Sequence, residues 1–161
     1  MLVDKITSKK QLIKALADEF DSCFDQSYPV VDLTDQTVAT VMDSAYSDPD
    51  VNDWLDGHEV VSIEPLDSHE SYSIMERFAL SRPDGQSQRL LDALSMRHPF
   101  RRFKDMVVRL GIADDWYAWR YEALLQHTEE SLEYYGIDFM DGRIVCTNKK
   151  NVRTYLREGM E

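Results

Sequence analysis

Histidines and acidic residues are the side chains of this chain that could carry acid–base or metal chemistry. The histidines are His58, His69, His98 and His127, and none of them stands in an HExxH or HxH arrangement. His69 and Glu70 are adjacent, so a helix would point their side chains to different sides. Zinc-type cysteine pairs, phosphate-binding glycine loops and nucleophile elbows are also absent from the sequence. We therefore expect no metal, no cofactor and no catalytic residue, and we favour a protein that is not an enzyme.

Four aspartates recur within one turn-rich segment, at Asp48, Asp50, Asp53 and Asp56. Their spacing is similar to the start of a calcium-binding loop, which needs a glycine at its sixth position and a glutamate at its twelfth. Counted from Asp48, the twelfth position is Glu59, but the sixth is Asp53 rather than glycine. We therefore interpret the four aspartates as a solvated acidic turn and as the candidate acidic interaction surface.

Acidic residues outnumber basic ones, and the whole excess lies in the first half of the chain. The net charge is −12, from 30 Asp and Glu against 18 Lys and Arg. Residues 1–75 hold 16 acidic and four basic residues, whereas residues 76–161 hold 14 of each. Residues 15–76 contain no basic residue at all. Such a field repels nucleic acid and attracts basic surfaces, so we expect a basic protein partner rather than direct binding of nucleic acid.

One stretch, FRRFKDMVVRLGIADDWYAWRYEALL, interleaves basic and aromatic residues in a way that is typical of nucleic-acid binding. On a helix over 100–110, however, the apolar side chains gather on one side and Arg101, Arg102 and Arg109 on the other. Asp105 lies three residues from Arg102 and four from Arg109, so it can pair with either. The stretch therefore favours a core-facing helix with a charged outer face.

The hydrophobic pattern predicts an α+β fold, a mainly helical single domain with a small β-sheet or hairpin. Capping-box patterns begin two of the helices, Ser8 with Gln11 and Asp67 with Glu70. The expected helices cover about 9–25, 34–45, 67–81, 90–98, 100–110, 114–136 and 148–156. The expected strands lie near 28–33, 59–63 and 142–147.

Helix ends are marked around the longest expected helix. Gly111 should break the helix before it, Asp114 is a good N-cap, and Gly136 is placed as a C-terminal cap. Trp116 and Trp119 share an apolar face of this helix. We interpret both tryptophans as core residues, and a partly exposed interface aromatic is the alternative.

The start of the chain lacks the apolar core of a signal peptide, and no apolar run approaches the roughly 18 residues of a membrane span. We expect a cytoplasmic protein without a membrane segment. Cys23 and Cys146 are far apart in the sequence, and a disulfide between them would be unusual in a reducing compartment. We interpret both as small core or surface residues.

A family resemblance is carried by DSHESYSIMERF, then RLLDALSMRHP, then FRRFKD at 100–105 and WYAWR at 116–120. In this order they resemble a bacterial family of uncharacterised proteins, numbered zero-one-five-eight, over about residues 59–137. The resemblance implies a small soluble protein with no established activity, and it supplies no catalytic residue. It also implies that residues 1–27, a helical segment, and residues 138–161, a strand and a helix, are additions to the shared part.

Three functions remain open on the sequence. The leading hypothesis is a non-enzymatic interaction module, such as an inhibitor or a DNA mimic, whose acidic half engages a basic partner. A second is a nucleic-acid or phosphate-binding module that uses Arg101, Arg102, Lys104 and Arg109. The third is a small enzyme whose site is assembled from scattered residues.

Overall fold

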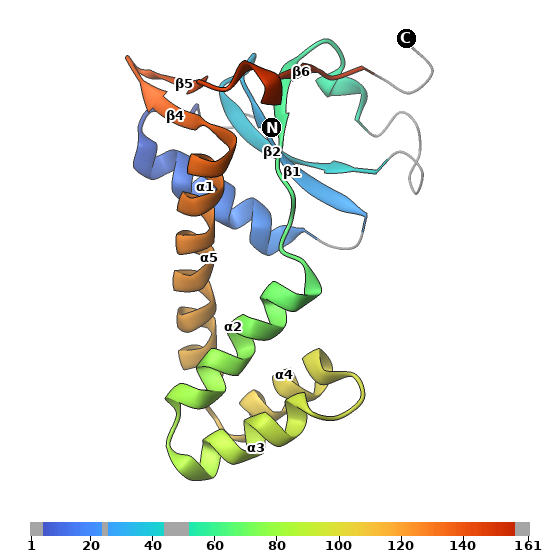
Figure 1. Cartoon of the computed structure of the whole chain (residues 1–161), viewed down its shortest axis with the longest axis vertical. Helices are drawn as coiled ribbons and strands as arrows, with labels where there is room; N and C mark the ends of the chain where they lie inside the picture. Colours follow the sequence, from blue (N-terminus) through green and yellow to red (C-terminus); the bar gives the residue numbers. More distant parts are fainter. Residues whose placement is uncertain (1–4, 24–25, 44–51, 157–161) are drawn as a thin grey trace. The chain divides into compact units, whose positions relative to one another are not determined.

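The computed structural model describes residues 5–23, 26–43 and 52–156 (Figure 1). This part of the chain holds five α-helices and two antiparallel sheets, so the predicted α+β fold with a helical majority is confirmed. The chain divides into two compact units, which we name the sheet unit, Met1–Pro65 with Leu124–Glu161, and the helical unit, Leu66–Ala123. Whether they fold as a single domain stays a prediction.

The larger sheet has the strand order β2-β1-β3-β6, and every neighbouring pair is antiparallel. Its strands are β1 (Ser27–Asp32), β2 (Thr37–Met42), β3 (Glu59–Ser62) and β6 (Arg153–Thr154). A separate hairpin pairs β4 (Ile137–Met140) with β5 (Arg143–Cys146). The strands expected near 28–33, 59–63 and 142–147 are thus present.

Helix α1 (Lys9–Ser22) packs against β1 and β2. The Ser8 side chain accepts a hydrogen bond from the Gln11 backbone N–H, as the sequence predicts, whereas the Gln11 side chain reaches back to Thr7 rather than to Ser8. The buried face of α1 consists of Leu12, Leu16, Ala17 and Phe20. The segment that the resemblance treats as an addition therefore contributes to the core of the sheet unit.

The predicted helix over 34–45 is wrong, because the described part of this segment forms a turn and strand β2. Val38 and Val41 have helical spacing, but Thr37, Val38, Thr40 and Val41 are β-branched and pack well on a pleated surface. All six residues of β2 pair with β1, from Thr37 opposite Asp32 to Met42 opposite Ser27. Pairing with a neighbouring strand therefore outweighs the local helical period.

The predicted terminal helix over 148–156 is also wrong. Asn148 does cap a helix, but a single 3-10 turn, η3 (Lys149–Asn151), which is followed by β6 on the edge of β3. The backbone N–H of Tyr155 donates to the carbonyl of His58, and the Tyr155 carbonyl accepts from Gly57. These partners lie almost a hundred residues away in sequence, so a local pattern does not reveal them.

Gln36 joins the two sheets of the sheet unit. It is buried with a positive φ of 58° in the β1–β2 turn. Its amide nitrogen donates to the Ile144 carbonyl at 3.1 Å, and its amide oxygen accepts from the Ile144 N–H at 2.6 Å. One side chain therefore takes the place of a strand neighbour for β5 and satisfies two backbone groups that would otherwise be buried without partners.

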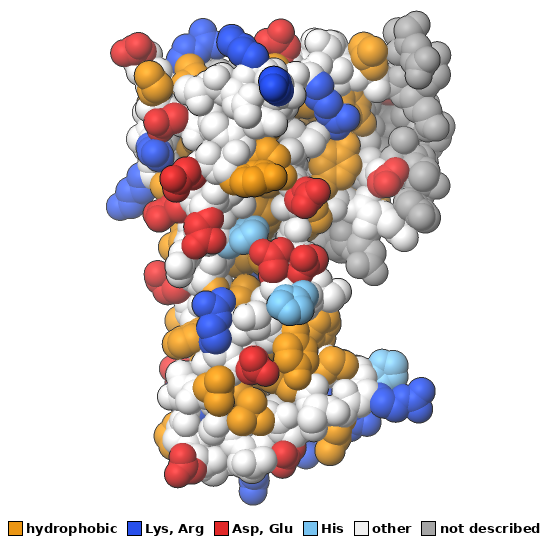
Figure 2. All heavy atoms as spheres, in the orientation of Figure 1, with side chains coloured by type: hydrophobic (Ala, Val, Ile, Leu, Met, Phe, Trp, Pro, Cys, Tyr) orange, Lys and Arg blue, Asp and Glu red, His pale blue; other side chains and the backbone are white. Residues whose placement is uncertain are grey.

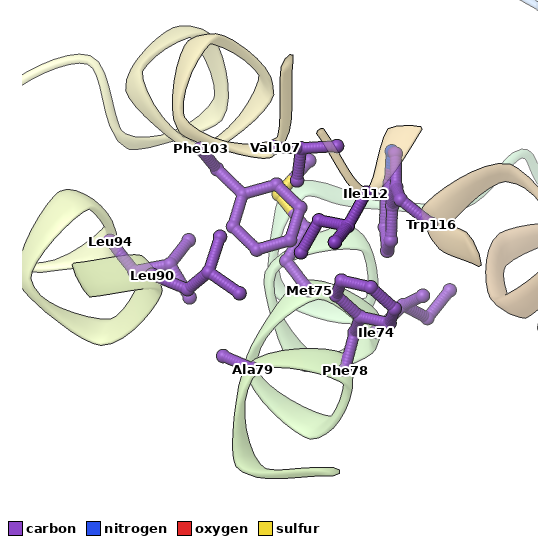
Figure 3. Packing of buried hydrophobic residues seen from close by; sticks show 10 residues of the cluster. All are labelled: Ile74, Met75, Phe78, Ala79, Leu90, Leu94, Phe103, Val107, Ile112 and Trp116. Carbon is purple, nitrogen blue, oxygen red and sulfur yellow. The ribbon is translucent and has the colours of Figure 1, made fainter. Parts of the chain in front are cut away.

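The helical unit is built from α2 (Ser68–Ser81), α3 (Asp84–Leu94), α4 (Pro99–Arg109) and the first half of α5 (Ala113–Tyr135). Figure 3 shows their apolar side chains converging on one core. Phe78, Phe103 and Trp116 meet edge to face at its centre, with ring centroids 4.9 to 6.2 Å apart. Such aromatic contacts add to the area that the rings bury. The core residues are Ile74, Met75, Phe78, Ala79, Leu90, Leu94, Phe103, Val107, Ile112 and Trp116.

Most predicted helix ends in this region are confirmed. Asp67 and Glu70 form a reciprocal capping box, and Gly111 and Gly136 have positive φ values of 71° and 76° where helices end. Asp114 is not the N-cap of α5, because the helix begins one residue earlier at Ala113. Asp114 instead lies in the first turn, where its charge still complements the positive end of the helix dipole.

The substitution Phe103→Ala is expected to destabilise the helical unit by about 3–5 kcal/mol, because it removes a fully buried ring from the aromatic centre. Val108→Ala on the same helix is the matched control, since Val108 is 67% exposed and its loss should change stability by less than about 0.5 kcal/mol. Chemical denaturation followed by circular dichroism measures both. If the free energy of unfolding falls equally in the two variants, Phe103 is not part of the assigned core.

Candidate functional site

A buried carboxylate at the end of β1 organises the polar part of the sheet unit. Asp32 has no exposed surface, and its Oδ1 accepts hydrogen bonds from the backbone N–H groups of Thr34 and Asp35 at 3.0 and 3.1 Å. Its Oδ2 lies 2.8 Å from Nδ1 of His58. Burial of a charge is costly unless it is paired and hydrogen-bonded, and Asp32 meets that condition through both oxygens.

His58 stands just before β3 and is held by both its backbone and its ring. Its N–H donates to Leu55, and its carbonyl accepts from Tyr155. Since a carboxylate can only accept, the 2.8 Å contact with Asp32 requires a proton on Nδ1. In the neutral ring, Nε2 is then the acceptor. Asp32 and His58 thus have the arrangement in which a carboxylate orients an imidazole.

Trp54 lies beside this pair and reaches into solvent. It belongs to the 3-10 turn η2 (Asp53–Leu55), whose Leu55 is fully buried, while Trp54 itself is 49% exposed. The Trp54 and His58 rings meet edge to face, with centroids 6.3 Å apart and an interplanar angle of 87°. A large apolar ring is therefore presented outward from a well-anchored turn.

Asn52 fixes the position of this turn. Its amide nitrogen donates to the Met42 carbonyl at 2.7 Å, which ties η2 to the end of β2. The phenol of Tyr155 packs in the same region, and burial raises its pKa, while the hydrogen bond with Asn52 opposes that shift. The phenol of Tyr155 is therefore neutral at physiological pH.

The structure places the predicted acidic residues only in part. Asp53 and Asp56 flank Trp54 and its neighbour Leu55, and both are half-buried rather than fully solvated. Asp48 and Asp50 lie outside the described residues. The site therefore joins two expected aspartates and His58, one of the four histidines considered in the sequence, to Asp32 and Trp54, which no sequence motif marks.

Three donor groups also come together here. Asp32, Asp35 and His58 each place one ligand-type atom so that all three lie within 4.8 Å of one another. Mixed carboxylate and imidazole donors suit zinc or manganese. Hydrogen bonds already engage both oxygens of Asp32 and Nδ1 of His58, however, and they account for the arrangement. The expectation of no metal stays a prediction.

The predicted basic face lies on the other unit, on α4. Arg101, Arg102 and Arg109 are exposed, while Phe103 and Val107 on the same helix are buried, as the projection predicts. Figure 2 shows Lys and Arg side chains gathered with a histidine where α3 and α4 are joined. The predicted pairing of Asp105 is not seen, since within the described residues Asp105 forms no ion pair with Arg102 or Arg109.

Neither cysteine supports a nucleophilic site. Cys23 and Cys146 are both free, so no disulfide joins them. Burial raises the pKa of the Cys23 thiol, and the nearby Glu19 carboxylate acts in the same direction. Reactive cysteines need a lowered pKa, so the environment of Cys23 disfavours the thiolate. Cys146 is buried and its thiol donates to the Asn148 carbonyl at 3.2 Å.

No sequence signal marks the pairing at the centre of the site. Asp32 and His58 are 26 residues apart, and the pattern between them predicts a helix where strand β2 lies. The one available hint is that Asp32 follows two consecutive valines that end a β-rich run. Polar residues at strand ends are often functional or structural, but the partner, His58, lies just before another strand, and only the fold brings it close.

Asp32→Ala is expected to destabilise the protein by about 1–3 kcal/mol, because it leaves the donors of Thr34, Asp35 and His58 without their acceptor. Asp35→Ala removes the same group from an exposed position, with 57% of its side chain accessible, and should change stability by less than about 0.5 kcal/mol. Thermal and chemical denaturation of both variants measure the difference. If Asp32→Ala is as stable as Asp35→Ala, the buried carboxylate does not organise the site.

Among the described residues, no helix is long and apolar enough to cross a bilayer. Comparison with protein-family models, with curated proteins and with solved structures found no match to this chain, so its resemblance to the uncharacterised bacterial family stays a prediction.

Proposed function

We propose that the sheet unit is a protein-interaction module that engages a basic surface of a partner protein, with Trp54 as its central contact. The observation that carries the proposal is a half-exposed tryptophan between two aspartates on an anchored turn. Tryptophan is enriched among the residues that dominate binding energy at protein interfaces.

The charge of the chain divides along the two compact units. The sheet unit carries 21 acidic and nine basic residues, whereas the helical unit carries nine of each. The whole net charge of −12 therefore belongs to the unit that presents Trp54. Such a field steers positively charged partners and raises their association rate, an effect that falls as salt rises.

The chemistry around Trp54 suits an arginine or lysine of the partner. A cation over an indole face gains about 0.5–2 kcal/mol, depending on how far it is desolvated. Asp53 and Asp56 flank the ring in the chain, and Asp35 lies 4.0 Å from His58, the ring neighbour of Trp54. The Asp35 carboxylate, with 57% of its side chain accessible, offers a charge that a bound guanidinium would need, and Asp53 and Asp56 add to the negative field.

An enzyme is the less supported reading of the same site. A carboxylate that orients a histidine is the arrangement of a general base, and the Asp32–His58 pair has it. The hydrogen bonds of Asp32 to its own turn, however, explain the pair without a substrate.

Trp54→Ala is expected to weaken binding of a short peptide of alternating arginine and serine about fivefold, because the indole contact is lost. The double variant Asp53→Asn with Asp56→Asn should weaken it by a similar factor and reduce its salt dependence between about 50 and about 200 mM. Isothermal titration calorimetry measures both.

The matched control is Glu129→Gln with Glu130→Gln, which removes the same charge from exposed positions on α5. This control variant should retain at least half of the wild-type affinity, because neither carboxylate belongs to the turn that carries Trp54. If the control weakens binding as much as the Asp53 and Asp56 variant, and Trp54→Ala has no effect, the peptide senses only net charge and the proposed site is wrong.

A further inference from the structure

A groove runs between α3 and α4 in the helical unit, with a volume of about 380 Å³. Volumes in this range accommodate ligands or side-chain clusters of a partner. The groove lies in a unit that is neutral overall, and none of its lining residues belongs to the turn that carries Trp54. Its lining residues are Arg89, Asp92, Ala93, Met96, Arg102, Asp105, Met106 and Arg109.

The rim formed by α4 has an alternating order of charges. Arg102, Asp105 and Arg109 are separated by three and four residues, so they share one face of the helix. At 1.5 Å rise per residue, the two arginines are about 10 Å apart along the axis, with the carboxylate between them. The α3 rim repeats part of this order with Arg89 and Asp92.

These charges are available to a partner. Within the described residues, none of Arg102, Asp105 and Arg109 forms an ion pair. Arg102 donates through Nε to the Arg97 carbonyl at 2.7 Å, which positions the guanidinium without neutralising it. All three side chains are exposed.

The remaining lining is apolar and adaptable. Ala93 is buried, Met106 is half-buried, and Met96 is 52% exposed. Methionine adapts to irregular apolar surfaces and is common at sites that accept partner helices. A groove whose lining combines methionines with charges of both signs fits an amphipathic helix better than a small polar solute.

We propose that this groove binds a helical segment of a partner protein that carries acid, base and acid at the same spacing, with a large apolar side chain facing the methionines. Each charge of the segment then meets its opposite on Arg102, Asp105 and Arg109. The charges of the partner segment have the same order from either end, and only the spacings of three and four residues exchange places. Charge alone therefore allows the partner helix to bind parallel or antiparallel to α4. A phosphate group fits less well, because Asp92 and Asp105 repel a dense anion.

The test compares two helical peptides of equal composition by fluorescence anisotropy. In one, glutamate, lysine and glutamate occupy the three positions, with a leucine on the adjoining face. In the other peptide the order is lysine, glutamate and glutamate, so that the lysine takes an outer position. The wild-type protein should bind the first about fivefold more tightly, since two ion pairs are exchanged for repulsions. Equal affinity for the two peptides would overturn the proposal.

A charge reversal in the groove sharpens the test. Asp105→Lys should lose affinity for the glutamate–lysine–glutamate peptide and gain it for a peptide with three glutamates. Glu76→Lys is the control, because it makes the same charge change at an exposed position on α2, outside the groove. Circular dichroism confirms that both variants are folded. A control that shifts preference as Asp105→Lys does would show an effect of net charge and contradict the groove.

Phosphate and nucleic acid form the last arm of the experiment. Inorganic phosphate and mixed oligonucleotides are titrated at about 50 mM salt into the wild type and Asp105→Asn. The proposal predicts weaker peptide binding by Asp105→Asn and no measurable binding of either anion. If Asp105→Asn instead binds oligonucleotides more tightly and neither peptide binds, the groove is an anion site and the proposal is wrong.

Discussion

The sheet unit depends on one buried charge. Asp32 satisfies two turn amides through one oxygen and the imidazole of His58 through the other, so its single carboxylate ties the β1–β2 turn to the segment before β3. The β1–β2 turn, the start of β3 and, through His58, the contact with Trp54 all follow from it. Because a buried carboxylate is tolerated only with such partners, its neighbours cannot change independently. The anchored position of the proposed interaction site is a consequence of this constraint.

The residues behind the family resemblance have a structural role in the helical unit. Met75, Phe78, Phe103 and Trp116 lie in its core, and Tyr72 packs against that core. A pattern of this kind specifies packing, because each ring is held by the others. It carries no information on Asp32 or Trp54, which precede the residues that the resemblance covers.

Elements with strong local signals could be predicted, and those determined by distant partners could not. The capping box of α2, the amphipathic α4 and the glycine ends follow from neighbouring residues, and all are confirmed. Strand β2 instead results from pairing with β1. The segment after the 3-10 turn η3 becomes strand β6, rather than a helix, because it pairs with the edge of β3. Of the site, Asp53 and Asp56 could be predicted from composition, whereas the contact between Asp32 and His58 needed the strand order.

The three tryptophans are distributed unequally between the two units. Trp54 is the sheet unit's tryptophan, while Trp116 and Trp119 both belong to the helical unit. Trp116 is buried against Phe78 and Phe103, whereas Trp54 faces solvent. Their emission should therefore differ in wavelength, because an indole in water emits further to the red than one in an apolar core. Trp119, which is 37% exposed and so is not the core residue that the pattern predicts, emits further to the red with Trp54, and Trp116 is the blue-shifted reporter of the helical core.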